Sequence, residues 1–131
     1  MFMAEAEGKK IPFVGEEHID AKVLESFPYV GPKQRIVYTT HEFSAVCPYS
    51  GLPDIATVII EYVPNELIVE LKSLKYYFLS YRSVGIYQEP ATARIYKDLF
   101  ALLKPLELKV SMTYNTRGGI DATTSVNSLE Q

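Results

Sequence analysis

The sequence predicts an α+β domain, in which two helices cover one face of an antiparallel sheet. Segments rich in β-branched and aromatic residues form two groups, at residues 35–63 and 106–126, and two segments with helical features lie between these groups, at 72–82 and 90–103. Pairs of adjacent strands with helices between them are typical of this layer arrangement. The length of 131 residues, with 47% hydrophobic and 22% charged residues, is ordinary for one hydrophobic core.

The first strand pair is expected at residues 35–46 and 55–63, because β-branched and aromatic residues dominate both segments. The sequence CPYSGLPD lies between them, at residues 47–54. Its prolines and glycine interrupt the regular hydrogen bonding of a sheet. We therefore expect a loop here, whose side chains face a pocket or solvent.

A short strand and a first helix are expected next. The strand at residues 67–71 follows the turn residues Pro64 and Asn65, and it leads into a helix at residues 72–82. Gly85 is expected to end this helix, because glycine adopts the left-handed conformation that closes many helices.

The second helix is expected to begin near Pro90, since proline is favoured in the first helical turn, and to stop at residues 104–105. The last strand pair follows at residues 106–115 and 120–126, around a hairpin turn at 116–119 that contains two glycines. Apolar side chains recur at helical spacing on one face of the second helix: Ile95, Leu99, Leu102 and Leu103.

Residues 1–34 contain several glycines and prolines and show no sustained period, so they are expected to form an N-terminal arm before a single catalytic domain at residues 35–131. The first ten residues lack the basic start and apolar core of a secretory signal. The longest apolar stretch, at residues 55–60, is far shorter than a bilayer requires. We expect a cytoplasmic protein that does not bind a membrane.

The expected partners follow from charge and from the sheet. A net charge of −3 disfavours direct binding of a nucleic acid, which is normally held by clustered Lys and Arg. The exposed edges of a small sheet and the ten tyrosines favour a homo-oligomer, because a barrel closed between copies removes the edges. The phosphate-binding sequences GxGxxG and GxxxxGK[ST] are absent, so a dinucleotide would have to bind in another way.

The only cysteine, Cys47, follows the first strand, and Asp54 stands at the far end of the same loop. If the loop folds back, the thiol and the carboxyl group meet. Two interpretations are open: a semi-buried thiol beside a turn-capping Asp, or a nucleophile beside a protonated Asp that protonates the nitrogen when the thiol adds to a nitrile. His18 and His41 do not have metal-ligand spacing to each other or to Cys47, so no metal site is predicted.

Two places could bind phosphate. Lys72 and Lys75 share one side of the first expected helix, and Ser73 and the free amides of the helix start add hydrogen-bond donors. Arg117 and Gly118 combine a cation with glycine-exposed backbone amides. The alternatives are a solvated basic edge and an ordinary hairpin tip.

Glu89 precedes a proline at the start of the second expected helix. It can complement the positive end of the helix dipole, or it can accept hydrogen bonds from the N–H groups of a guanine-like base.

Four segments together resemble the NADPH-dependent 7-cyano-7-deazaguanine reductases: FSAVCPYSGLPD, ELKSLKYY, the pair Gln88-Glu89, and TRGGI. They occur in this order between residues 42 and 120. The resemblance implies the tunnelling fold of GTP cyclohydrolase I in a short, single-module form. It also implies an oligomeric barrel with active sites at subunit boundaries.

The resemblance further implies an enzyme of queuosine biosynthesis, the pathway of a tRNA modification, that reduces the nitrile of 7-cyano-7-deazaguanine to the aminomethyl group. Cys47 would form a covalent thioimide, Asp54 would supply the proton, and two NADPH molecules would supply hydrides. The implied substrate-binding residues are Val69, Glu70, Leu71, Gln88 and Glu89, and the implied cofactor-binding residues are Lys72, Ser73, Lys75, Arg117 and Gly118.

One position departs from the family pattern, since the residue before the base-binding Glu is usually His and is Gln88 here. Glutamine donates and accepts hydrogen bonds but does not titrate. Two alternatives remain open. One is an archaeosine-type amidinotransferase, which acts on a nitrile attached to tRNA without NADPH. The other is a non-catalytic module that binds a deazaguanine or a pterin.

Overall fold

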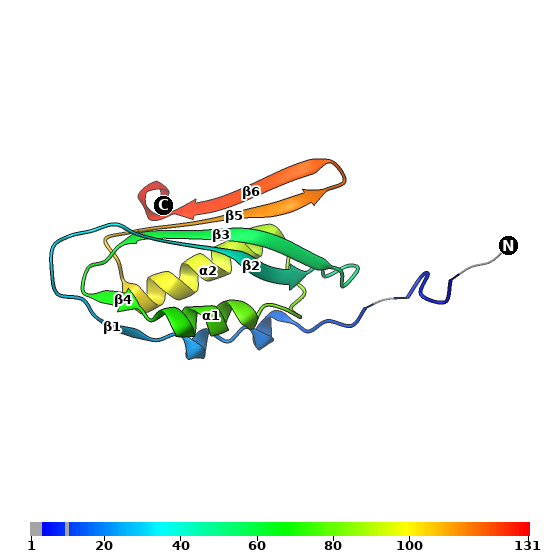
Figure 1. Ribbon diagram of the computed structural model, residues 1–131, viewed down its shortest axis with the longest axis horizontal. Coiled ribbons are helices and arrows are strands. Elements are labelled where there is room, and N and C mark those ends of the chain that lie inside the picture. The colour runs from blue at the N-terminus through cyan, green and yellow to red at the C-terminus, as the bar shows by residue number, and fades with distance from the viewer. Residues whose placement is uncertain (1–3, 10) are drawn as a thin grey trace.

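Figure 1 shows the computed structural model, which describes residues 4–9 and 11–131. Four strands form an antiparallel sheet in the order β2-β3-β5-β6, and helices α1 (Leu71–Leu79) and α2 (Gln88–Leu103) lie on one of its faces. The predicted α+β arrangement is confirmed. The strands are β2 (Ile36–Val46), β3 (Pro53–Val63), β5 (Glu107–Arg117) and β6 (Ile120–Asn127).

The core forms because alternate residues of each strand point toward the helices. In β3, Val58 and Ile60 are buried while Ile59 between them is exposed. Helix α2 buries Ile95 and Leu99 against the sheet, as its helical spacing predicts. Each such side chain contributes about 1.5–3 kcal/mol when it is fully buried.

Both helices differ from the expected bounds. Helix α1 spans Leu71–Leu79 and ends before residue 82, because the N–H of Ser80 bonds the carbonyls of Tyr76 and Tyr77 in a tighter turn. Gly85 therefore does not cap this helix.

Helix α2 spans Gln88–Leu103 and so begins two residues before Pro90, which occupies the first turn, where a missing N–H costs no intrahelical bond. It ends as expected at Lys104, whose φ of 44° is left-handed.

The sequence predicted an N-terminal arm at residues 1–34 and indicated no particular element in it, whereas the structure shows three short ones. Strand β1 (Ser26–Pro28) pairs with β4 (Leu67–Val69), and two 3₁₀ turns precede it at Glu16–His18 and Ala21–Val23. A three-residue strand is too short to show a period, and its partner lies far along the chain. Residues 1–3 and 10 of this expected arm lie outside the described residues.

Within the described part of the chain, no helix combines the length and the apolar character that a bilayer crossing requires. The same residues contain no group of three or more His, Cys, Asp or Glu side chains placed to hold a metal ion.

Candidate active site

The loop between β2 and β3 folds back on itself. The N–H of Cys47 donates to the carbonyl of Leu52 at 2.9 Å, and the N–H of Gly51 donates to the carbonyl of Cys47 at 2.8 Å. Asp54 pairs with Ala45 in the ladder, so it belongs to β3 and not to the loop. The loop is therefore shorter than predicted, and Cys47 and Asp54 lie at the same end of the sheet.

The surroundings of Cys47 favour its thiolate. Hydrogen bonds from the backbone N–H groups of Ser50 and Tyr49 lower the pKa of the thiol, and the Ser50 hydroxyl and the charge of Arg117 act in the same direction. The side chain is partly exposed. A thiol with a lowered pKa and access to solvent is suited to nucleophilic attack.

The carboxylate of Asp54 is buried, with 5% of the residue exposed, and its Oδ1 forms an ion pair with the guanidinium of Arg117. Arg117 ends β5, where the ladder to β6 is irregular after Tyr114. A neighbouring cation favours the ionised form of a carboxylate. The sequence interpretation placed a protonated Asp54 beside the thiol and Arg117 at phosphates, whereas this arrangement favours an ionised Asp54 whose partner is Arg117.

The start of α2 is fixed beside the strand end that carries Cys47. The N–H of Val46 donates to the carbonyl of Val84 at 3.0 Å, and the N–H of Ile86 donates to the carbonyl of Val46 at 3.1 Å. The segment that leads into Gln88 and Glu89 therefore runs along the strand end that carries Cys47. Glu89 is exposed in the first turn of α2.

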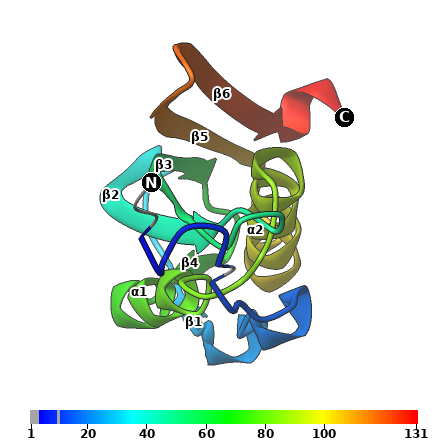
Figure 2. The same cartoon turned by 90° about the vertical axis from the view of Figure 1, so that its right-hand side faces the viewer.

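The N-terminal arm packs on this end of the molecule, which the sequence did not indicate (Figure 2). The N–H of Val14 donates to the carbonyl of Ser83 at 2.8 Å, and the N–H of Gly85 donates to the carbonyl of Val14 at 2.9 Å. A Cβ at Gly51 would lie 2.2 Å from the carbonyl oxygen of Ile11, so the arm touches the Cys47 loop directly. Glycine in the loop was a visible signal of a tight turn, but not of this contact.

The predicted residues Val69, Glu70 and Leu71 lie at the opposite end of the sheet. The N–H of Val69 donates to the hydroxyl of Tyr62 at 3.2 Å, and Tyr62 lies eight positions along β3 from Asp54. Eight residues of strand span about 27 Å. One chain therefore does not bring these residues together with Cys47.

Two residues of the ELKSLKYY octet, residues 70–77, hold the start of α1. The Glu70 carboxylate accepts the N–H of Ser73 at 2.8 Å, which caps the helix. The Ser73 hydroxyl donates to the carbonyl of Glu70 at 2.7 Å and accepts the N–H of Glu25 at 3.0 Å. Ser73 is 5% exposed, so its bonds are made inside the protein.

A groove of about 470 Å³ lies between α1 and the edge strand β2. Leu71 and Lys75 of the octet line it, together with Thr39 and Glu42 of β2. Lys72 and Lys75 are both exposed. The groove offers an apolar wall with cations beside it.

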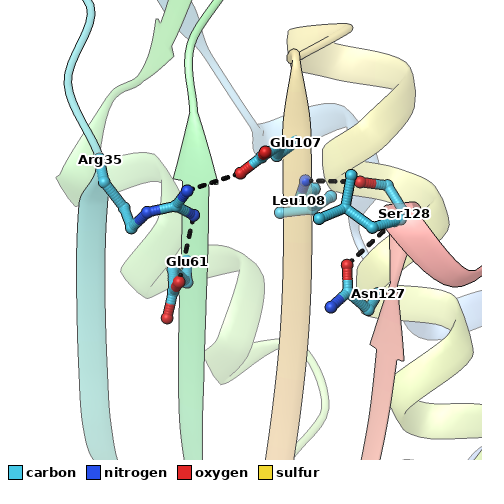
Figure 3. A network of polar contacts seen from close by, with 7 residues as sticks. Arg35, Glu61, Glu107, Leu108, Asn127 and Ser128 are labelled. Atoms are coloured by element: carbon cyan, nitrogen blue, oxygen red, sulfur yellow. Dashed lines mark hydrogen bonds and ion pairs between the residues drawn. The ribbon is translucent and has the colours of Figure 1, made fainter.

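The end of the sheet far from Cys47 carries a polar network that Figure 3 shows. Arg35 bonds Glu61 at 3.2 Å and Glu107 at 2.7 Å, and Glu107 is the main cause of the raised pKa of Arg35. These charges, from the residue that precedes β2 and from β3 and β5, satisfy one another, so we assign them a structural role.

The fold and this site define a small α+β protein with a partly exposed cysteine of lowered thiol pKa at the end of an antiparallel sheet. The sequence profile of the QueF-like protein family matches residues 53–131. The chain belongs to this family, which confirms the resemblance found in the sequence.

Proteins named NADPH-dependent 7-cyano-7-deazaguanine reductase are similar to nearly the whole chain. The one from Thermotoga petrophila is 56% identical over 98% of this chain and 94% of its own length. The one from Caldicellulosiruptor bescii is 50% identical over 86% of this chain and 87% of its own length. The chain is also similar to a crystal structure of the archaeosine synthase QueF-Like in the apo form, with a TM-score of 0.65 and 22% sequence identity. The similarity covers 76% of this chain and 96% of that chain, and it shows a shared fold.

Proposed function

We propose that this chain reduces the nitrile of 7-cyano-7-deazaguanine to the aminomethyl group of 7-aminomethyl-7-deazaguanine, with NADPH as the reductant. The relatives that share about half or more of its residues carry the name of this activity. The structural observation that supports it most directly is a thiol of lowered pKa beside the ion pair of Asp54 and Arg117. This combination can both attack a nitrile carbon and move one proton.

The first step needs a nucleophile and a proton for nitrogen. The Asp54 carboxylate accepts the thiol proton of Cys47, the sulfur–carbon bond forms as one π bond of the nitrile breaks, and Asp54 returns the proton to the nitrogen. The product is a neutral thioimide, and Asp54 ends the step ionised again. Arg117 stabilises this ionised state before and after the transfer, so one carboxylate serves first as base and then as acid.

The residues around the groove fit a dinucleotide phosphate. Lys72 and Lys75 are exposed beside an apolar wall that can cover a flat ring. Two NADPH molecules that bind there in turn would each supply one of the two hydrides that convert the thioimide to the amine. Ser73 holds the helix start that carries these lysines, and Gly118 at the hairpin tip presents a left-handed backbone with φ of 58°.

The substrate pocket requires a second copy of the chain. Glu89 and Gln88 stand near Cys47 and can bind the N–H groups of the base, whereas Val69, Glu70 and Leu71 stand at the other end of the sheet. A neighbour packed end to end would bring its Val69–Leu71 segment to the Cys47 of this chain. We therefore propose a homo-oligomer with its sites at subunit boundaries.

The substrate in this proposal is the free base, because a chain of net charge −3 is poorly suited to a large polyanion. The place of action is the cytoplasm, which holds the NADPH pool that the reaction consumes.

The test is to incubate the protein with 7-cyano-7-deazaguanine, record its intact mass, and then add NADPH and follow the nicotinamide absorbance. We expect a covalent adduct that disappears on reduction and never forms in Cys47→Ala. Asp54→Asn should form it about a hundredfold more slowly. No adduct on the intact protein would refute the proposal, and modification of tRNA with glutamine or ammonia, without NADPH, would identify an amidinotransferase instead.

A further inference from the structure

Tyr114 of β5 carries a buried hydroxyl without a hydrogen-bond partner among the described residues. The residue is 4% exposed. An unsatisfied buried hydroxyl costs about 1–3 kcal/mol, so proteins rarely keep one without a reason. The other buried tyrosines show the contrast: the hydroxyl of Tyr77 bonds Asp98 at 2.6 Å and Tyr81 at 2.8 Å.

The sheet register places Tyr114 beside the catalytic carboxylate. Tyr114 pairs with Ala56 of β3, and Asp54 lies two positions from Ala56, on the same face of the strand. On its other side Tyr114 pairs with Ala122 of β6. Both neighbours have the smallest side chain that carries a Cβ, so they do not fill the space around the phenol.

The first turn of α2 lies over the same spot. The Thr92 hydroxyl contacts that of Thr124 on β6 at 2.5 Å, which fixes α2 above this strand. From this contact, one helical turn back along α2 leads toward Glu89 and covers about 5.4 Å. Two residues back along β6, from Thr124 to Ala122, cover about 6.8 Å in the same direction, toward the Cys47 end. Glu89 and the strand position that pairs with Tyr114 therefore lie near each other. Burial raises the pKa of Tyr114, and Tyr81 and Glu89 raise it further, which agrees with this proximity.

We propose that the Tyr114 hydroxyl donates a hydrogen bond to the 6-oxo group of the bound deazaguanine and so determines base specificity; this rests on the proposed function. Around the edge of the base, the 6-oxo group lies between the N1–H and 2-amino groups, which suit Glu89, and the 7-nitrile, which Cys47 attacks. Tyr114 is close to both Glu89 and Asp54, because Glu89 acts on its pKa and Asp54 lies two ladder positions away. A phenol O–H supplies the donor that a carbonyl oxygen needs.

The test compares Tyr114→Phe with the intact protein for two bases without a nitrile: 7-deazaguanine, and 2-amino-7-deazapurine. The second base lacks the 6-oxo group and also the N1–H that suits Glu89, but the latter loss is the same for both proteins. We expect Tyr114→Phe to bind 7-deazaguanine about three- to tenfold more weakly and the second base equally well. Its melting temperature should stay the same or rise, because the free protein loses no bond. Tyr77→Phe, the matched control, should melt earlier and bind both bases unchanged.

Equal binding of 7-deazaguanine by Tyr114→Phe and the intact protein would overturn the inference. An equal loss for both bases, or a fall in melting temperature like that of Tyr77→Phe, would also overturn it, since either result assigns the hydroxyl a structural role. If the intact protein does not bind 7-deazaguanine at all, the proposed function fails and this inference fails with it. This failure of the proposed function can be told apart from the other outcomes, because it is measured on the intact protein without any substitution.

Discussion

Arg117, at the end of β5, forms an ion pair with the buried carboxylate of Asp54 at the start of β3. The Asp54 side chain is 6% exposed and that of Arg117 is 46% exposed, so the cation shields an acid that has little contact with water. The same cation lowers the pKa of Cys47. One arginine therefore acts on both Asp54 and Cys47, the residues that we propose as proton carrier and nucleophile.

Arg117→Met should lower the free energy of unfolding by about 1–3 kcal/mol at neutral pH, because it leaves a buried carboxylate without its partner. Urea unfolding measures this, and the loss should disappear in the background of Asp54→Asn. Arg94→Met is the control, since it breaks the 2.8 Å ion pair with Asp98 and should leave adduct formation intact. If Arg117→Met keeps full adduct formation, Arg117 does not support the chemistry of Asp54.

The rate at which iodoacetamide alkylates Cys47 should rise with pH and level off below the ordinary pKa of a cysteine thiol, because the thiolate is the reacting form and its pKa is lowered. Ser50→Ala should move this midpoint upward. The shift will be partial, since the backbone N–H groups of Ser50 and Tyr49 remain. Ser111→Ala, in the middle of β5, should not move it. An unchanged midpoint in Ser50→Ala would exclude a contribution from the hydroxyl.

Gly51→Ala should disturb the contact between the arm and the nucleophile loop. Gly51 has φ of 72°, and its new Cβ would meet the carbonyl oxygen of Ile11. Gly8→Ala is a matched control, because Gly8 has φ of 79° with nothing within 4 Å. We expect Gly51→Ala to cost about 1–2 kcal/mol more than Gly8→Ala in thermal unfolding and to change the alkylation rate of Cys47. Equal effects of both variants would mean that the arm does not support the loop.

Stability should fall at alkaline pH. Burial raises the pKa of Tyr62 to about 12, whereas in the unfolded chain it is about 10. The stabilising effect of this shift is complete below pH 10 and is lost as the pH rises toward 12, by at most about 1.4 kcal/mol per pH unit. Urea unfolding between pH 9 and 11 should show a shallower decline for Tyr62→Phe. Tyr49→Phe should decline like the intact protein, because Tyr49 is 84% exposed.

Two inactive variants should restore activity when they are coexpressed, if sites form between chains. Cys47→Ala lacks the nucleophile, and the double variant Lys72→Glu with Lys75→Glu lacks the cofactor cations. Random mixing should leave about one quarter of the sites with both parts intact. NADPH consumption measures the recovery, and a mixture of Cys47→Ala with Cys47→Ser should stay inactive. No recovery in the first mixture would place each site within one chain.

The secondary structure near the site was largely predictable because its signals are local. Alternation and β-branched residues marked β2 and β3, and helical spacing marked α2. The start of β3 was predicted two residues late, because the prolines and the glycine indicated a loop that continues to Asp54. In the structure, the pairing of β3 with β2 already begins at Pro53. Proline is accepted there because it is the first residue of the strand.

By itself, the sequence determined the family, the order of the strands and helices from residue 35 onward, and the candidates Cys47 and Asp54, because each depends on neighbouring residues or on a contiguous motif. The tertiary structure alone decided that Arg117 contacts Asp54, that the arm lies on the Cys47 loop, and that Val69–Leu71 stands at the far end of the sheet. Such contacts join residues that are distant along the chain, and no local period or propensity encodes them. They form only when the strands align in register and the helices pack on the sheet, which brings together side chains that the sequence keeps apart.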